Sequence, residues 1–377
     1  MTQISKLNEL REKLHKCPEL SLEEYYTQKI LEDFIVKVTE GGTSFKIFKP
    51  FHTSLVVEYR NGGDIPFKLI RADMDALPVT ESENNGIVSE KKGLMHACGH
   101  DVHMTILCGL ISRTAHEKPA SNLLFVFQPG EEGAGGAKKM LETGFFDNYA
   151  VDSVYALHVT DDHDLGEVAS NGSILFAIPR EVDIIFKGRS AHAAYPEKGS
   201  NALSAAVFFL SSVEHIIRRS LNPTGVFLAH FGKMTSGTAR NIVADHAKVE
   251  GTLRAFKSDI MEKGSLIIEK TAAECAAGFG CTAEMKVLGE YVEVRNSPAL
   301  FKKLQEVSQK TGIKCIEKEG ELVGEDFGYF TRKWPGILFW LGARKHGSDR
   351  KALHSQSFFP SNDVISVGLE VMSGLIK

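Results

Sequence analysis

The sequence lacks long hydrophobic runs. In its 377 residues the apolar stretches, such as NLLFVFQP and GILFWLG, have the length of a buried strand, whereas a membrane-spanning helix needs about 20 apolar residues. The first twenty residues, MTQISKLNELREKLHKCPEL, mix charged and apolar residues at helical spacing and lack the basic start and apolar core of a signal peptide. We therefore expect a cytoplasmic protein with no membrane contact.

A surplus of basic charge is also missing. The chain carries 44 lysines and arginines against 48 aspartates and glutamates, which gives a formal net charge of −4. Proteins that bind nucleic acid neutralise phosphates with lysine and arginine. The charge balance therefore indicates that nucleic acid is not a partner.

Cysteine is scarce, with six residues scattered over the chain. Disulfide frameworks occur in small exported proteins, so we expect reduced and mostly buried cysteines. Cys98 differs from the others because it lies in MHACGHDVH (95–103), which also holds three histidines and an aspartate. This stretch needs a chemical explanation.

The length predicts two domains, because one hydrophobic core rarely serves so long a chain. Residues 1–177 begin with helical patterns and continue with buried strands such as FKLIRADMDA, NLLFVFQPGEEG and VYALHV. Ser21 and Glu24, three residues apart, form the capping-box pattern of a helix start. Residues 293–377 return to apolar strands and helices, so we expect one discontinuous α/β domain whose site lies at the strand ends.

The predicted order of strands and helices changes in residues 178–292. Four alternating strands are interleaved with two helices, NALSAAVFFLSSVEHIIRR and IMEKGSLIIEKTAAECAAGFG. This order is typical of an α+β ferredoxin-like unit. We therefore predict an inserted second domain over 178–292.

Residues with the chemistry of metal ligands occur in four separate places. They are Cys98, His100, Glu132, His158 and His354. Thiolate, imidazole and carboxylate bind zinc and neighbouring divalent ions, and catalytic sites leave a position for water. Glu131, beside Glu132, has the chemistry of a general base for such a water.

Each of these residues alone has an ordinary interpretation. A histidine in ALHV is more often a core residue than a ligand, EEG is usually a solvated turn, and a lone cysteine is usually inert. A thiol nucleophile at Cys98 is a competing interpretation, but it gives no task to the paired carboxylates and the other histidines. The recurrence of histidines and acids at the ends of apolar strands favours the metal site.

The motifs resemble one family. In order along the chain they are RADMDALP (71–78), MHACGHDVHM (95–104), FQPGEEGAGGAKKML (127–141), ALHV (156–159), GRSAHAAYP (188–196), ARNIVADHAKVEGTLR (239–254) and GEDFGYF (324–330). This series is similar to that of the dinuclear-metal amidohydrolases, which include hippurate hydrolases, aminoacylases and carboxypeptidase-G-like enzymes. The resemblance covers nearly the whole chain.

The resemblance implies roles for the residues of the first domain. Cys98, His100, Glu132, His158 and His354 would hold two divalent ions, which the sequence leaves open as zinc, nickel, cobalt or manganese. Glu131 would be the general base. Asp75 matches an aspartate that orients a metal ligand, with Asp73 as the alternative. The Cys-x-His form belongs to the hippurate-hydrolase-like branch.

The resemblance also implies roles for three residues of the inserted domain. His192 would donate to the oxyanion, often in the active site of a partner subunit, and Asn241 and Arg254 would contact the substrate. From the residues alone, Asn241 could equally cap a turn and Arg254 could face solvent. Because the family uses this domain for subunit contacts as well as for a lid, a homodimer or homotetramer is expected.

The expected substrate is a small N-acyl amino acid. Within the branch, NGSILFA, SAHAAYP and GEDFGYFTRKWPGILFWLG are most similar to enzymes that remove the acetyl group from N-acetyl-L,L-diaminopimelate on the acetylase route to lysine. The alternatives are a general N-acyl-amino-acid amidohydrolase and a noncatalytic binding protein that kept the fold. An intact Glu131 and a full set of ligands argue against the noncatalytic alternative.

Overall fold

The computed structural model describes residues 2–40, 42, 44–222 and 225–377, and the chain divides into two compact units. The first unit consists of Met1–Leu175, Val294–Glu319 and Asp326–Lys377, and the inserted unit of Phe176–Glu293 and Gly320–Glu325. The short segment 320–325 thus groups with the inserted unit, whereas the sequence pattern assigned it to the first domain.

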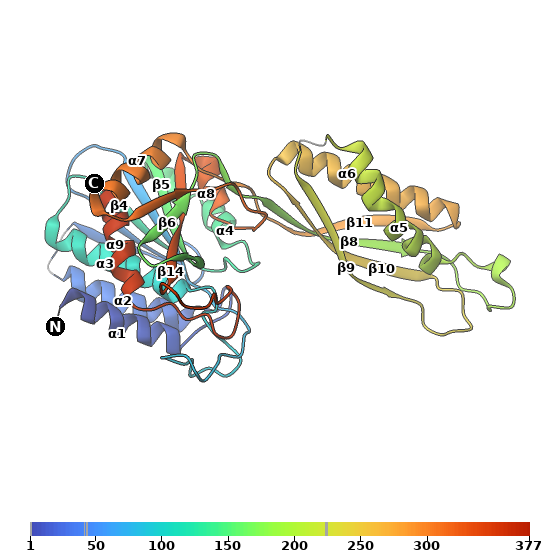
Figure 1. The fold of residues 1–377 in the computed structure, drawn as a ribbon, viewed down its shortest axis with the longest axis horizontal. Coiled ribbons are helices and arrows are strands. Elements are labelled where there is room, and N and C mark those ends of the chain that lie inside the picture. Colours follow the sequence, from blue (N-terminus) through green and yellow to red (C-terminus); the bar gives the residue numbers. More distant parts are fainter. Residues whose placement is uncertain (1, 41, 43, 223–224) are drawn as a thin grey trace. The chain divides into compact units, whose positions relative to one another are not determined.

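A mixed sheet forms the centre of the first unit (Figure 1). Among the described residues its strand order is β1-β2-β4-β3-β5-β14-β6-β13. The strands are β1 (Phe45–Phe48), β2 (Leu55–Tyr59), β3 (Phe67–Asp73), β4 (Asn122–Gln128), β5 (Val151–Asp164), β6 (Glu167–Ser170), β13 (Lys314–Glu317) and β14 (Gly336–Arg344). The central strands β4, β3, β5 and β14 are parallel to their neighbours in that group. The predicted α/β class is therefore confirmed.

Helices cover the sheet in two groups. The elements are α1 (Gln3–Lys16), α2 (Tyr25–Thr39), α3 (His100–Glu117), α4 (Gly136–Glu142), η1 (Phe145–Asn148), α7 (Pro298–Thr311), α8 (Gly328–Lys333) and α9 (Asp363–Ile376). Helix α3 packs on β3 and contacts α1, α2 and α9, while α4 and α8 contact each other and the strands β4 and β14. Because β4 is buried at every position, it is covered on both faces.

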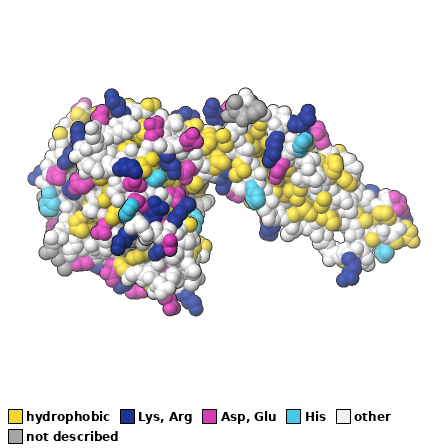
Figure 2. Space-filling view, in the orientation of Figure 1, with side chains coloured by type: hydrophobic (Ala, Val, Ile, Leu, Met, Phe, Trp, Pro, Cys, Tyr) yellow, Lys and Arg dark blue, Asp and Glu magenta, His cyan; other side chains and the backbone are white. Residues whose placement is uncertain are grey.

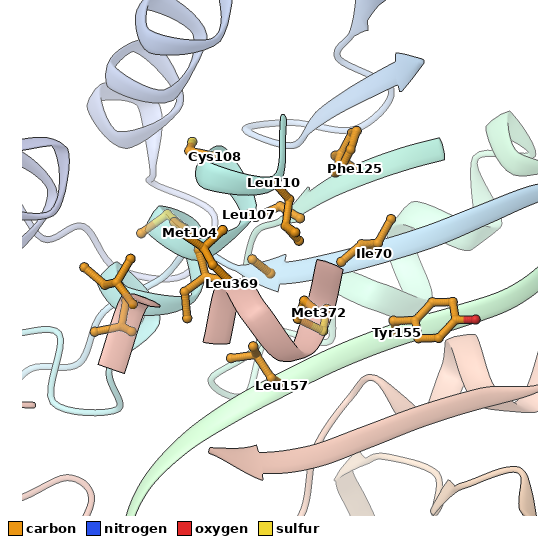
Figure 3. Close-up of a cluster of buried hydrophobic side chains, with 14 of the residues drawn as sticks. Ile70, Met104, Leu107, Cys108, Leu110, Phe125, Tyr155, Leu157, Leu369 and Met372 are labelled. Atoms are coloured by element: carbon orange, nitrogen blue, oxygen red, sulfur yellow. The ribbon is translucent and has the colours of Figure 1, made fainter. Parts of the chain in front are cut away.

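The main core lies between α3, α9 and one face of the sheet, and Figure 3 shows part of it. Alternate residues of β4 point into this core, as expected for a strand. The helices approach closely at Gly109 of α3, where a Cβ atom would lie 2.7 Å from a methyl carbon of Leu369 and 3.0 Å from one of Leu7. Glycine at this position lets α3 pack against both α1 and α9.

The inserted unit has its own core around a four-stranded antiparallel sheet with the order β11-β8-β10-β9. Its elements are β8 (Ile178–Lys187), η2 (Pro196–Lys198), α5 (Ala202–Ser220), β9 (Phe227–Ser236), β10 (His246–Ala255), α6 (Ser258–Gly278) and β11 (Thr282–Glu290). Figure 1 shows both helices on one face of this sheet. The short strands β7 (Ile174–Phe176) and β12 (Val294–Arg295) pair with each other where the chain passes between the units.

Helix α2 does not begin with the capping box that the spacing of Ser21 and Glu24 predicted. The helix begins at Tyr25, its N-cap is Glu24, and within the described residues no side chain caps it. Ser21 and Glu24 form no capping box, because both side chains bind elsewhere, as shown below. None of the helices in the described ranges is long and apolar enough to cross a bilayer.

Replacing a core leucine tests the packing between α3 and α9. Leu369 is completely buried, so Leu369→Ala should leave a cavity and lower the free energy of unfolding by about 2–5 kcal/mol. Val36→Ala, at a side chain that is 53% exposed, is the control and should change it by less than about 1 kcal/mol. Urea unfolding measures both, and equal effects would contradict this packing.

Candidate functional site

Parallel strands bring the sequence motifs to one edge of the large sheet. Asp73 is the last residue of β3, Glu131 and Glu132 follow β4, and His158 lies within β5 opposite Trp340 of β14. Because the carboxyl ends of parallel strands share an edge, residues more than 80 positions apart meet there. The predicted location at the strand ends therefore fits the observed topology.

A left-handed glycine shapes the MHACGHDVH loop. Gly99 has φ 85° and precedes α3, which begins at His100. A Cβ atom at this position would lie 2.3 Å from a methyl carbon of Val159, so no other residue fits without displacing β5. Gly99 thus makes a tight turn, and this turn places Cys98 and His100 on either side of the glycine.

The five candidate ligands come together. The sulfur of Cys98 lies 3.3 Å from Nε2 of His158 and 3.3 Å from Nε2 of His354. The His354 nitrogen is also 3.3 Å from Oε1 of Glu132. Ligand atoms of Cys98, His100 and Glu132 all lie within 4.8 Å of one another.

The hydrogen bonds of two histidines leave their inner nitrogens facing this cluster. The Nδ1–H of His100 donates to the carbonyl of Asp75 at 2.8 Å, and that of His158 donates to the carbonyl of Val159 at 2.8 Å. The buried Nε2 of His100 has no hydrogen-bond partner among the described residues. A histidine whose outer nitrogen is held by a carbonyl directs its inner nitrogen toward a metal ion, which would displace any proton there, so the donor set fits divalent ions.

His103 lies beside the candidate ligands, but its ring nitrogens bind other groups of the protein. Asp73, His100, His103 and His158 form a second close group of potential ligands. However, Nε2 of His103 accepts the backbone N–H of Val159 at 2.9 Å, and its Nδ1 binds Asp73 at 2.6 Å. Both ring nitrogens are therefore used in supporting the site, and His103 has none left for an ion.

Acidic groups surround the thiol of Cys98. Burial, with the nearby carboxylates of Glu132 and Glu131, raises the pKa of Cys98 well above its ordinary value. Without a cation the sulfur is therefore held as the thiol. A nucleophilic cysteine needs a lowered pKa, so the site disfavours the thiol mechanism and favours a cation that would hold the thiolate.

The two aspartates of RADMDALP have different contacts. The carboxylate of Asp75 accepts the backbone N–H groups of Glu131 and Glu132 at 3.0 and 2.9 Å, and its carbonyl holds His100. Asp73 instead binds Arg71 and His103, and its Oδ2 lies 3.7 Å from Nε2 of His100. Although burial lowers it, Asp73 and Asp75 raise the pKa of His100 to about 10. The outer contacts of His100 favour Asp75 as the orienting aspartate.

A buried charge network behind the strand ends was missed in the sequence. The guanidinium of Arg71 donates to Gln128, Asp73 and Asp326 at 2.7–2.9 Å, and Asp326 also accepts the N–H of Ala137. The signal was an arginine inside the apolar strand FKLIRAD, since a buried charge requires partners. This network joins three motifs of the sequence.

The structure brings His192 and Asn241 together in the inserted unit but separates them from Arg254. The N–H of Ala193 donates to the carbonyl of Asn241, and both side chains are exposed. Nδ1 of His192 accepts the N–H of Ala194 at 3.1 Å, which leaves Nε2 as the protonated nitrogen. Arg254 lies near the far end of β10. At about 3.3 Å per residue of a strand, it is roughly 27 Å from His246, the first residue of β10. Its guanidinium pairs with Glu181 at 3.2 Å.

Helix α1 supports the loop from the other side. Asp101, next to His100, accepts from Arg11 at 3.0 Å and binds Nδ1 of His15 at 3.0 Å, while Nε2 of His15 binds Glu81 at 2.9 Å. Burial lowers the pKa of His15, but Asp101 and Glu81 together raise it to about 9. His96 is buried with neither ring nitrogen bonded among the described residues, and burial lowers its pKa to about 4; nothing in the structure explains it.

The pKa of His15 predicts a pH-dependent contribution to stability. It rises from 6.5 to about 9 on folding, so the contribution is complete below pH 6.5 and disappears as the pH rises through 9. His15→Gln should cost about 3 kcal/mol more at pH 6 than at pH 9.5 in metal-free protein. Urea unfolding measures this, with His346→Gln, at a side chain 94% exposed, as the control. A constant difference across this range would contradict the ion pair.

Comparison with known proteins agrees with the site. Residues 69–377 match the model of peptidase family M20/M25/M40. The chain is 38% identical over 379 residues to N-acetyldiaminopimelate deacetylase of Streptococcus pneumoniae (strain Taiwan19F-14), covering 98% of each chain.

Solved structures show the same fold. A dinuclear metal binding peptidase of the M20 family from Bacillus subtilis aligns with a TM-score of 0.84 at 27% identity, over 99% of this chain and 97% of that one. A chain from methicillin-resistant Staphylococcus aureus aligns with a TM-score of 0.91 at 24% identity, over 99% and 96% of the two chains. The family match over residues 69–377 and the similarity over nearly the full length show that this chain belongs to peptidase family M20/M25/M40.

Proposed function

We propose that the protein is a metal-dependent amidohydrolase that removes the acetyl group from N-acetyl-L,L-diaminopimelate, giving diaminopimelate and acetate. Cys98, His100, Glu132, His158 and His354 would hold two divalent ions, of zinc, nickel, cobalt or manganese. The convergence of these five side chains at the strand ends carries the proposal. The similarity to the Bacillus subtilis protein, a dinuclear metal binding peptidase, supports two ions.

The ions, when bound, would polarise the acyl carbonyl and lower the pKa of water. The carboxylate of Glu131, largely buried beside Glu132, would accept the proton of the attacking water and pass it to the leaving amine. Asp75 holds the backbone of both glutamates, so one carboxylate can face the ions while its neighbour acts on the water. Asp73 would act indirectly, through His103.

His192 would donate a hydrogen bond from Nε2 to the developing oxyanion. Its Nδ1 is occupied as an acceptor, which fixes the proton on the nitrogen that such a role requires. Loss of one such donor typically lowers the rate about a hundredfold or more. Asn241, beside His192, and Arg254 would contact polar groups of the substrate.

The identity of the substrate rests on the relatives. The similarity to N-acetyldiaminopimelate deacetylase extends over 98% of both chains at 38% identity, and diaminopimelate would place the reaction in lysine biosynthesis. Diaminopimelate carries two carboxylates, which need cationic partners. Arg180 is not free for this task, because it pairs with Glu262 and Glu290.

The inserted unit would serve as a lid and a subunit contact. Its strand order and two helices fit a ferredoxin-like arrangement. Its exposed apolar side chains include Val207 and Phe208 on α5, and Figure 2 shows hydrophobic side chains gathered on the visible face of this unit. His192 and Arg254 lie near opposite ends of β10, a separation much longer than an acetylated amino acid. One inserted unit would therefore lend its two ends to two active sites, as in a homodimer or a dimer of dimers in the cytoplasm.

Amine release from a panel of substrates tests the proposed reaction. Purified protein reconstituted with divalent metal should hydrolyse N-acetyl-L,L-diaminopimelate with a kcat/KM at least about 100-fold above those for hippurate, N-acetylmethionine and N-acetyllysine. Comparable rates would replace the proposal with a general N-acyl-amino-acid hydrolase. No release from any of the four, with two ions bound, would contradict amidohydrolase activity on this class of substrate.

Replacing Glu131 separates its role from that of the ligands. Glu131→Gln should keep the bound metal and lower kcat by at least about 100-fold, because the amide cannot accept a proton. Metal analysis and steady-state kinetics measure the two effects. Glu23→Gln, an exposed change nearby, is the control, and normal turnover by Glu131→Gln would remove Glu131 from the mechanism.

Mixing two inactive variants tests whether His192 serves a partner subunit. Glu131→Gln and His192→Ala homodimers should each be nearly inactive. Their mixture, after subunit exchange, should regain activity, because one site of each heterodimer combines an intact Glu131 with an intact His192. Activity that stays at the level of the separate variants, with exchange verified by mass spectrometry, would show that His192 does not serve a partner subunit. An active His192→Ala homodimer would remove His192 from the mechanism.

A further inference from the structure

The segment before α2 is built for a purpose other than starting the helix. Leu22 has φ 65°, a conformation that leucine rarely adopts, and Glu24 does not cap α2. Instead, Oε1 of Glu24 accepts the N–H of Leu22 at 2.9 Å and reaches across the fold to accept the N–H of Gly130, also at 2.9 Å. The strained turn directs the carboxylate away from its own helix and toward the loop that follows β4.

Three successive backbone N–H groups of that loop are held by two carboxylates. The N–H of Gly130 is bound by Glu24, and those of Glu131 and Glu132 are bound by the two oxygens of Asp75 at 3.0 and 2.9 Å. Ser21 joins Asp75 to the turn, because its hydroxyl contacts Oδ2 of Asp75 at 2.6 Å and the carbonyl of Glu132 at 3.2 Å. Residues from two distant parts of the chain, 21–24 and Asp75, thus fix one turn.

The burial of the Glu24 carboxylate is energetically unfavourable. The side chain is completely buried, and burial together with the nearby charge of Asp75 raises its pKa to about 7. A buried carboxylate is unfavourable unless its oxygens are bonded, and here its other oxygen accepts from the hydroxyl of Thr53 at 2.5 Å. Three donors converge on this carboxylate, one of which belongs to the turn of the candidate active site.

The turn needs such restraint because its two glutamates have different tasks. Gly130 has φ 68°, and a Cβ atom there would lie 3.0 Å from a methyl carbon of Leu22. Rotation of the peptide between Pro129 and Gly130, whose N–H Glu24 accepts, would redirect the chain into Glu131 and so move its carboxylate relative to that of Glu132. We propose that Glu24 is a positioning residue, which holds the amide of Gly130 and thereby fixes the direction of Glu131 against Glu132. This inference rests on the proposed function only for its effect on the rate.

Two conservative variants of Glu24 distinguish the length of its side chain from its negative charge. Glu24→Gln keeps the length of the side chain, since its carbonyl can accept from Leu22 and Gly130 while its amide donates to Thr53. Glu24→Asp keeps the charge but draws the carboxylate back from Gly130. Glu23→Asp, at the exposed neighbouring glutamate, is the matched control.

Amide hydrogen exchange of the segment 129–134 in metal-free protein is the first measurement, because it requires neither metal nor substrate. Glu24→Asp should speed exchange in this segment by about tenfold to a hundredfold, while Glu24→Gln and Glu23→Asp stay near the wild-type rate. Unchanged exchange in Glu24→Asp, or faster exchange in Glu24→Gln than in Glu24→Asp, would overturn the proposal.

Kinetics on N-acetyl-L,L-diaminopimelate is the second measurement. With two ions bound, Glu24→Asp should lower kcat about tenfold or more with little change in KM, because a displaced general base affects the reaction more than binding, and Glu24→Gln should restore most of it. Equal kcat values in Glu24→Asp and the wild type would contradict the positioning role. If the wild type hydrolyses no N-acyl amino acid, the proposed function fails, while the exchange result still decides whether Glu24 holds the turn.

Discussion

Buried negative charge at one edge of the large sheet is the constraint on which the rest of the structure depends. The carboxylates of Glu131, Glu132, Asp73 and Asp75 gather there around the thiol of Cys98, largely screened from water. Such a group of acids is stable only with compensating charge and hydrogen bonds. The backbone N–H groups of the loop after β4, the guanidinium of Arg71 and the histidines supply part of the compensation, and divalent ions would supply the remainder.

This constraint explains why distant segments converge on one short turn. Asp75 follows β3 and Glu24 precedes α2, and both bind backbone N–H groups of the turn after β4. Asp326, just before α8, binds the N–H of Ala137 in the helix α4 that follows the turn. Backbone donors are directional and cannot rotate away as side chains can. A turn held in this way presents two neighbouring glutamates in fixed and different directions, as a base and a ligand require.

Much of this could be predicted from the sequence, because periodicity and strand-end chemistry are local signals. The buried strands, the glycine turn before α3 and the five candidate ligands could all be recognised there. Glu24 could not, since the spacing from Ser21 to Glu24 is the same in a capping box and in this turn, and only the fold decides between them. The partners of Arg71 lie up to 255 residues away, and the separation of His192 from Arg254 depends on the register of β10, which no local pattern specifies.

The central claim, that the five residues hold two divalent ions, is most directly tested by cobalt binding to metal-free protein. Equilibrium dialysis should give two cobalt ions per chain, and the near-ultraviolet spectrum should show a thiolate-to-cobalt charge-transfer band that is absent in Cys98→Ser. Binding of one ion or none, or the same band in Cys98→Ser, would contradict the assignment of the site.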